Sequence, residues 1–253
     1  MKRGTIILLI LIGNFFASGQ TALTSIRLCR QSTNIAAYKT LVGHSFFQCG
    51  FRDDFCTKEL MYKAINMGIS KNNGALTCNF NHYGYSQFGE LELQLGYAHC
   101  FGHKLSIALQ GVYLLQHATH YKSQHSFTVD ISFAYQTTQN LLIAIDLYNP
   151  IRMRYGITGK EIIPMQFRVL ANYQPSERIS ANIFCQKTLP GDFEIGLEFG
   201  YQPITSLVIM GNCSLRKCGI GIHIPWKRIV FSIQSDWYYR ISLSPGSDIL
   251  FIL

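Results

Sequence analysis

The feature that most constrains this sequence is an alternation of apolar and polar residues that continues through most of its length. In residues 90–98 (ELELQLGYA), an apolar side chain occupies every second position. The same period recurs in residues 104–113, 126–135, 165–173, 193–201 and 229–237. Successive side chains of a β-strand point to opposite faces, so a period of two indicates strands with one apolar face. The sequence therefore predicts a chain built largely of β-strands.

Weaker segments of the same kind fill the intervals, at residues 41–50, 59–69, 74–83, 141–148, 179–187, 206–213, 218–224 and 247–253. Together the segments predict about 14 strands, in a range of about 12 to 16. At about ten residues each, such strands use about 140 residues and leave connections of about seven residues. One domain over residues 40–253 accounts for all of them.

The composition separates a membrane barrel from the alternative, a soluble β-sandwich. Charged residues make up 14% of the chain, against about 25% in a typical soluble domain. A sandwich in water needs a polar face rich in Lys, Glu and Thr. Here the polar positions hold mainly Ser, Gly, Ala, Asn and Gln, which suit a crowded interior. After the N-terminal segment no 18 consecutive residues are apolar, so no spanning helix is expected. We predict an all-β fold, an antiparallel transmembrane β-barrel.

The first residues indicate export. Lys2 and Arg3 precede an apolar run at residues 5–11, and residues 17–19 (ASG) provide small side chains for cleavage before Gln20. Residues 1–19 are thus predicted to be a signal peptide, and residues 20–39 a periplasmic or luminal segment. An exported barrel belongs in the cell outer membrane, so outer-membrane lipid is an expected partner.

Connections and aromatic residues predict the orientation of the barrel. Links after even-numbered strands are short and rich in turn-forming residues, whereas links after odd-numbered strands are mostly longer. Bacterial barrels have short periplasmic turns and longer external loops. Aromatic residues are expected at both membrane interfaces, with Tyr97, Tyr135, Tyr173 and Tyr201 at the periplasmic rim and Tyr113, Tyr148 and Trp237 at the outer rim.

Charged residues also occur on the polar face of the strands, where they would point into the lumen. These lumen-facing candidates are Glu90, Glu92, Asp130, Arg168, Glu194, Glu198 and Asp236. They could line a polar pathway, or they could form a hydrogen-bonded network that fills the barrel. One Arg cannot pair with six carboxylates, so water or basic loop residues must enter, or some carboxylates stay protonated.

A second group of charged residues is predicted to form an external basic rim. Its members are Arg152, Arg154, Lys160, Arg216 and Lys217. The rim could simply be solvated. It could also bind lipopolysaccharide phosphate or an acidic partner, because a guanidinium pairs with phosphate through two hydrogen bonds.

Cysteines are numerous for an exported barrel, with eight in the chain. Cys213 and Cys218 flank one predicted hairpin and lie in the apolar phase of their strands. A disulfide between them is geometrically possible, and export permits it. The alternative is that the cysteines are free and act as small apolar side chains.

Other function classes lack support in the sequence. The histidines of residues 117–125 and 99–103 do not complete a four-ligand metal set, so neither metal nor cofactor is expected. Motifs of hydrolases, nucleotide-binding enzymes and metalloproteases are absent, which argues against an enzyme. The formal net charge is +8, but basic residues are scattered rather than clustered, so nucleic acid is not an expected partner.

Residues 45–253 resemble outer-membrane barrels of the PorV/PorQ type, which are related to the long-chain fatty-acid transporter fold. The matching stretches, in order, are residues 59–60 (EL), 89–97 (GELELQLGY), 148–150 (YNP), 171–177 (ANYQPSE), 193–199 (FEIGLEF) and 243–245 (LSP). The resemblance implies 14 strands, an N-terminal segment inside the barrel and no enzymatic activity. Two features differ from such relatives: residues 21–39 lack their Gly/Ala-rich stretch, and the chain ends in Leu253 rather than an aromatic residue. The first difference predicts a reduced luminal plug.

These observations leave two classes of function. The first is a channel or transporter for small or hydrophobic solutes that uses the barrel lumen. The second is a non-conducting component of a surface or protein-secretion assembly, with secretion or surface proteins as partners of its external loops. Lumen charges and the reduced plug favour the first class, and the basic rim and the PorV/PorQ resemblance favour the second.

Overall fold

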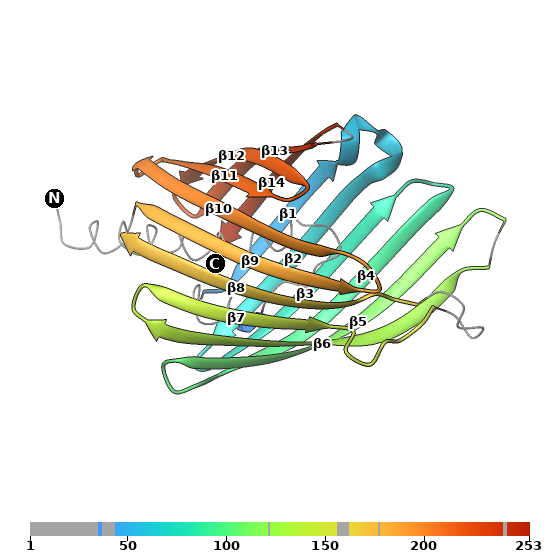
Figure 1. Cartoon of the computed structure of the whole chain (residues 1–253), viewed down its shortest axis with the longest axis horizontal. Coiled ribbons are helices and arrows are strands. Elements are labelled where there is room, and N and C mark those ends of the chain that lie inside the picture. Colours follow the sequence, from blue (N-terminus) through green and yellow to red (C-terminus); the bar gives the residue numbers. More distant parts are fainter. Residues whose placement is uncertain (1–34, 37–43, 121, 156–161, 177, 240–241) are drawn as a thin grey trace.

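The computed structural model describes residues 35–36, 44–120, 122–155, 162–176, 178–239 and 242–253. These residues form one closed antiparallel barrel of fourteen strands (Figure 1). The predicted signal peptide and most of the predicted segment at residues 20–39 lie outside the described residues. Among the described residues, no helix is long and apolar enough to cross a membrane.

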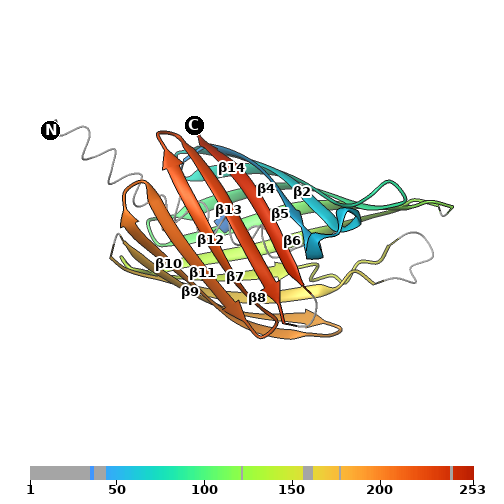
Figure 2. The same cartoon turned by 90° about the horizontal axis from the view of Figure 1, so that it is seen from above.

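The strands follow one another around the barrel in sequence order, and the first pairs with the last (Figure 2). Their bounds are β1 Phe46–Asp53, β2 Met61–Lys71, β3 Gly74–Gly84, β4 Phe88–Phe101, β5 Leu105–Ala118, β6 Gln124–Thr138, β7 Leu141–Tyr148, β8 Met165–Ser176, β9 Ile179–Leu189, β10 Phe193–Ile204, β11 Leu207–Ser214, β12 Lys217–Trp226, β13 Ile229–Tyr238 and β14 Leu243–Ile252. Closure leaves no strand edge unpaired, as a membrane requires.

The prediction of fourteen strands is confirmed, but the bounds of the first and the last strand in the sequence differ from those predicted. The first was predicted at residues 41–50 but runs from Phe46 to Asp53. The last was predicted from residue 247 but begins at Leu243 and contains Pro245. Because proline lacks an N–H and removes a bond from a sheet, the sequence favoured a strand that began after it.

Short connections lie at one end of the barrel and the long ones at the other. Links after even-numbered strands contain two or three residues, and the C-terminus joins this end through Ile252, whose N–H donates to the carbonyl of Arg228. At the opposite end, the longest link joins β7 to β8 and spans residues 149–164. Two 3-10 turns, η1 Asp54–Cys56 and η2 Lys58–Leu60, connect β1 to β2 at that same end. We call this end the loop end.

The two faces of the barrel wall differ as the alternation predicts. Side chains at alternate positions of each strand are buried in the interior, whereas their neighbours are exposed on the outer surface. The exposed positions carry large apolar side chains, which include the predicted rim residues Tyr97, Tyr135, Tyr173, Tyr201 and Trp237. The prediction for Tyr148 was wrong, because its side chain is only 6% exposed and points inward with Ala144 and Asp146.

Small side chains line the interior towards the short-turn end. This buried cluster contains Ala75, Ala98, Ala108, Ala134 and Ala144 with larger aliphatic residues from β7–β14. Ile35 and Ala36 belong to the same cluster, and Ile35 contacts the space beside Gly96 of β4. The Ala36 N–H donates to Ser132 Oγ of β6 at 3.4 Å. Part of the N-terminal segment therefore packs inside the barrel, where alanine and glycine leave it room.

Candidate functional site

The main cavity lies at the loop end of the barrel and has a volume of about 80 Å³. Strands β2–β5, β7 and β8 and the β7–β8 connection contribute its lining. The lining is mostly aromatic and aliphatic: Tyr62, Tyr83, Leu91, Leu114, Tyr148, Tyr155, Ile162, Ile163 and Pro164, with Asn81, Glu90, Glu92 and Gln166 as the polar members. We call this cavity the mouth pocket. Ligand pockets in proteins typically combine such an apolar lining with a few polar groups.

Asn149 positions the β7–β8 connection over the mouth pocket. Its side chain is 0% exposed, and its φ of 49° is in the left-handed region that asparagine tolerates. Asn149 Oδ1 accepts hydrogen bonds from Thr128 Oγ1 at 2.7 Å and from the Met153 N–H at 2.8 Å. Asn149 Nδ2 donates to the carbonyl of Ile163 at 2.7 Å. One buried amide thus joins β6 to both ends of the connection.

Apolar contacts complete this closure. Ile163 packs with Val112 and Leu114 of β5 and with Tyr148 of β7, and Tyr155 packs against the same cluster. Sequence reasoning missed Asn149 and Ile163 because it treated residues 149–164 as an external loop. A signal for Asn149 was present in the Tyr-Asn-Pro stretch at residues 148–150, but nothing in it indicated a buried side chain.

The two carboxylates of the mouth pocket accept hydrogen bonds from neighbouring amides. Gln94 Nε2 donates to Glu92 Oε1 at 2.6 Å, and Gln116 Nε2 donates to Glu90 Oε1 at 3.3 Å. The Gln94 amide oxygen in turn accepts from Asn79 at 3.0 Å and from Gln110 at 2.7 Å. This chain of amides across β3–β5 forms a polar floor beneath the apolar pocket.

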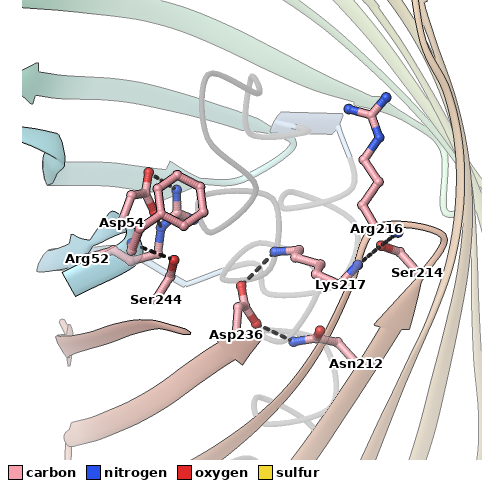
Figure 3. Close-up of polar contacts among 9 residues, drawn as sticks. Arg52, Asp54, Asn212, Ser214, Arg216, Lys217, Asp236 and Ser244 are labelled. Atoms are coloured by element: carbon pink, nitrogen blue, oxygen red, sulfur yellow. Dashed lines mark hydrogen bonds and ion pairs between the residues drawn. The ribbon is translucent and has the colours of Figure 1, made fainter. Parts of the chain in front are cut away.

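A second polar region at the loop end contains two ion pairs (Figure 3). Lys217 Nζ lies 2.6 Å from Asp236 Oδ2, and Asn212 Nδ2 donates to Asp236 Oδ1 at 3.0 Å. Arg52 Nε lies 2.6 Å from Asp54 Oδ1, and its second nitrogen donates to Asp54 Oδ2 at 3.1 Å. Both pairs are buried, so each charge replaces lost hydration with a direct partner.

The prediction that Lys217 belongs to an external basic rim is wrong. Its side chain is buried, with 4% of the residue exposed, and it points into the barrel. Lys217 is the first residue of β12, in the same phase as the inward residues Gly219 and Gly221. The predicted strand began one residue later, at Cys218, and therefore left Lys217 in the loop. The sequence analysis expected basic loop residues to enter the lumen, because carboxylates outnumber the one arginine predicted there. Lys217, at the boundary between the loop and β12, is such a residue.

The other rim candidates do not form one patch. Arg152 and Arg154 are exposed on the β7–β8 connection, and Lys160 lies outside the described residues. Arg216 is exposed and pairs with Asp192, with 2.6 Å between the guanidinium nitrogen and the carboxylate oxygen. Its hydrogen bond to Asp192 raises the pKa of Arg216.

The predicted luminal charges all point inward, but they do not converge on one site. Glu92, Asp130, Arg168, Glu198 and Asp236 are buried, while Glu90 and Glu194 are partly buried. Arg168 lies opposite Asp146 across β7 and β8, and its guanidinium is 5.3 Å from the centre of the Phe184 ring. Glu198 accepts a hydrogen bond from Asn182 at 3.2 Å. Most of these charges are therefore spread through a hydrogen-bonded interior.

Among the described residues, sequence reasoning missed four inward charges besides Lys217, namely Arg52, Asp54, Asp146 and Asp248. The predicted first strand ended at residue 50, before Arg52 and Asp54. The sequence did indicate that Asp146 faces inward, because it lies between Ile145 and Leu147, whose apolar side chains face outward. Asp248 had no such signal, because Leu250 and Ile252 in the same phase of the predicted strand are apolar. In the structure it accepts a hydrogen bond from Gln48 Nε2 at 3.0 Å.

A smaller cavity of about 30 Å³ lies along β1, β2, β13 and β14. Its lining includes the polar side chains of Gln48, Arg52, Asn66, Gln234 and Asp248, together with Phe51 and Ala64. We call it the inner cavity. Tyr62 lines both cavities and is only 7% exposed. The Arg52 guanidinium carbon lies 5.8 Å from the centre of the Tyr62 ring.

Cysteine and metal chemistry can be assessed for the described residues. No disulfide joins any of their seven cysteines in the structure, and the predicted bond between Cys213 and Cys218 stays a prediction. Cys213 and Cys218 are direct partners across β11 and β12, next to the turn that joins these strands. No group of three or more His, Cys, Asp or Glu side chains within the described ranges could hold a metal ion.

Comparisons with known proteins place the fold. No protein-family model and no curated protein sequence matches the chain. Among solved structures, the toluene transporter TodX of Pseudomonas putida superposes with a TM-score of 0.67 at 9% identity, over 87% of this chain and 91% of that one. The monoaromatic hydrocarbon channel CymD superposes with a TM-score of 0.65 at 7% identity, over 92% of this chain and 97% of that one.

The class that this fold defines is the closed antiparallel β-barrel, the architecture of the two structures named above. The superpositions cover 87% and 92% of the chain, so the likeness extends over most of the barrel. The resemblance to PorV/PorQ proteins receives no support from a family model. At such low identity the comparisons establish the fold, and the use of the barrel has to be argued from its own residues.

Proposed function

We propose that this protein is an outer-membrane channel for small hydrophobic solutes and not an enzyme. The observation that carries the proposal is the mouth pocket, where aromatic and aliphatic side chains line a cavity at the loop end. An open water-filled porin would need polar residues at this position instead. The barrels named above as a toluene transporter and a monoaromatic hydrocarbon channel have the same fold, which supports the proposal.

The orientation follows from the proposed location. If the short turns face the periplasm, the mouth pocket opens towards the cell exterior, where solutes arrive. The exposed apolar band and its tyrosine rim support insertion in a lipid bilayer. Export requires the signal peptide at residues 1–19, and cleavage would make Gln20 the first residue of the mature chain, which N-terminal sequencing can test.

Filling the mouth pocket tests the proposal directly. Gln166 of β8 lines the pocket, whereas the adjacent Phe167 is 40% exposed on the outer face. We expect Gln166→Trp to slow uptake of the apolar dye N-phenyl-1-naphthylamine by cells that produce the protein. The matched variant Phe167→Trp places the same side chain towards lipid and should leave uptake unchanged. Equal uptake in wild type and Gln166→Trp would contradict a route through this pocket.

The second candidate is a non-conducting membrane component of a PorV/PorQ-like secretion or surface assembly. The dense interior favours it, because buried residues such as Gln94, Gln110 and Thr128 leave little space for a water column. A channel for apolar solutes can tolerate such an interior if side chains move, whereas an ion-conducting pore cannot. Silence in a planar bilayer together with no dye uptake by cells would favour the assembly role.

A further inference from the structure

We propose that Cys213 and Cys218 form a disulfide in the exported protein and lock the β11–β12 hairpin at the loop end. The two residues are direct partners across antiparallel strands. Cα atoms of such partners lie about 4.5–5.5 Å apart, within the range of about 4.4–6.8 Å that a disulfide spans. The register therefore brings the two residues within the Cα separation that a disulfide needs.

The side chains also converge. Both residues lie on the outer face of their strands, and their sulfur atoms share one partner, the Tyr239 hydroxyl. Cys213 Sγ lies 3.4 Å from Tyr239 Oη, and Cys218 Sγ lies 2.8 Å from the same oxygen. One phenol thus holds both thiols on the same side of the hairpin.

No other described cysteine has this relation. Cys49, Cys78, Cys100 and Cys185 have strand partners, but none of these partners is a cysteine. These four residues are therefore internal controls that should stay reduced. Cys213 and Cys218 are partners because of the β11–β12 register, and not simply because the chain contains many cysteines.

The bond forms by thiol–disulfide exchange with an oxidised dithiol oxidase of the cell envelope. The thiolate of one cysteine attacks the oxidase disulfide, which gives a mixed disulfide and releases one oxidase thiolate. The second cysteine thiolate then displaces the other oxidase sulfur. Two thiol protons are released, the cysteine pair loses two electrons and the oxidase disulfide gains them. The step uses the envelope location proposed above but not the transport function.

The lock would support the buried ion pair beside it. Lys217 lies between the two cysteines and reaches inward to Asp236, while Arg216 reaches outward to Asp192. A covalent bond between Cys213 and Cys218 would hold together the two strands that flank Arg216, and with them Lys217 at the start of β12. The disulfide would thus fix the entrance geometry of the barrel at β11–β13.

The test is peptide mapping of protein extracted from outer membranes in the presence of N-ethylmaleimide. Trypsin cuts after Arg216 and Lys217, so it separates the cysteines into peptides 188–216 and 218–227. We expect the two peptides to remain joined and to separate only after reduction. Two separate maleimide-modified peptides would overturn the proposal. In Cys213→Ser protein, Cys218 should become fully modified, which shows that the reagent reaches this position.

A second, independent inference concerns Tyr62. Because this residue lines both the mouth pocket and the inner cavity, we infer that its ring is the partition between them. Arg52 holds the ring from one side at 5.8 Å, and Asp54 fixes Arg52 through two hydrogen bonds. A guanidinium over an aromatic face is attractive, so this arrangement keeps the ring in place. The inference rests on the proposed channel function.

Removing the ring should join the two cavities. We expect Tyr62→Ala and Tyr62→Leu to raise the initial rate of N-phenyl-1-naphthylamine uptake at least about twofold, because each removes the partition while keeping the strand. Ile65→Ala shortens an exposed side chain on the outer face of the same strand and, as the matched control, should stay at the wild-type rate. Unchanged uptake in both enlarging variants, with folded barrel shown by gel mobility before and after boiling, would overturn the inference. Absence of uptake in the wild type would instead count against the channel function itself.

Discussion

At the residue scale, the ion pair between Lys217 and Asp236 shows how the barrel handles charge in its interior. The Asp236 carboxylate accepts hydrogen bonds from both Lys217 and Asn212, so its hydration is replaced on both oxygens. The Lys217 ammonium also lies 5.5 Å from the centre of the Tyr238 ring. Removing one member of such a pair leaves the other charge buried, which costs more than the pair contributes.

Lys217→Met should therefore destabilise the barrel. We expect a loss of about 3–5 kcal/mol in the free energy of unfolding, because Asp236 remains charged without its main partner. Urea unfolding of the protein in lipid vesicles, followed by tryptophan fluorescence, measures this change. Arg216→Met is the matched control, since Arg216 is exposed and its surface ion pair contributes about 0–1 kcal/mol. Equal stability of the two variants would contradict the assignment of Lys217 to the interior.

Single residues also mark the limit of prediction from the sequence. Alternation placed Glu92, Asp130 and Arg168 on the inward face, because each lies between apolar residues of the opposite face. Lys217 and Tyr148 were misassigned for different reasons. Lys217 sits at a strand boundary that a pattern of period two does not locate. Tyr148 follows the inward phase of β7, but aromatic residues at strand ends are also expected at membrane interfaces.

At the scale of elements, the β7–β8 connection behaves as part of the barrel interior and not as a free external loop. Asn149 bonds to β6 and to both ends of the connection, and Ile163 packs on β5 and β7. Ser126 Oγ of β6 donates a further hydrogen bond to the carbonyl of Arg154 at 2.9 Å. Strand alternation cannot predict this folding-in, because it depends on contacts between segments far apart in the sequence.

Asn149→Gly isolates the contribution of the Asn149 side chain. Glycine tolerates the left-handed backbone at this position. The variant therefore removes the hydrogen bonds of the Asn149 side chain without adding backbone strain. We expect faster hydrogen exchange at the Met153 and Ile163 amides, whose protection depends on the folded connection. Asn140→Gly, in the short β6–β7 turn, should leave both amides unchanged. Unaltered exchange in Asn149→Gly would show that the apolar contacts alone hold the connection.

A second feature at this scale is the contact between Ile35 of the N-terminal segment and the inner face of the barrel wall. Ile35 occupies the space that a side chain on Gly96 of β4 would need. Gly96→Leu should therefore displace Ile35 and expose its neighbour. The measurement is maleimide labelling of Ala36→Cys in a chain whose natural cysteines are replaced by serine. Labelling should rise with Gly96→Leu but not with Gly211→Leu, because nothing lies within 4 Å of the space beside Gly211. If labelling does not increase with Gly96→Leu, the position of Ile35 does not depend on the space beside Gly96.

At the scale of the whole molecule, the closed barrel was predictable and its interior was not. Fourteen alternating segments, low charge and asymmetric connections all fit a single architecture, a closed wall with apolar side chains outside and packed side chains inside. The pockets depend on which side chains leave space between distant strands, and no period in the sequence encodes that. The resulting molecule combines a largely apolar pocket at the loop end with a densely hydrogen-bonded interior.

The external surface leads to a prediction about lipid. We propose that Arg152 and Arg154, which are exposed on the β7–β8 connection, bind lipopolysaccharide phosphate. The variant Arg152→Glu/Arg154→Glu should copurify with less lipopolysaccharide than the wild type, because phosphate would face like charges. Lys227→Glu/Arg228→Glu, at the opposite end of the barrel, is the control and should retain the lipid. If the Arg152→Glu/Arg154→Glu variant copurifies with as much lipopolysaccharide as the wild type, the two arginines do not bind its phosphate.

The most direct test of the account is dye uptake by living cells. A bacterial strain whose intact outer membrane excludes N-phenyl-1-naphthylamine is compared with and without the protein, and fluorescence reports dye that reaches the interior. We predict a severalfold higher initial rate with the protein, lowered by Gln166→Trp and unaffected by Phe167→Trp. An uptake rate equal to that of cells without the protein, while folded barrel is present in the outer membrane, would contradict a channel for small hydrophobic solutes.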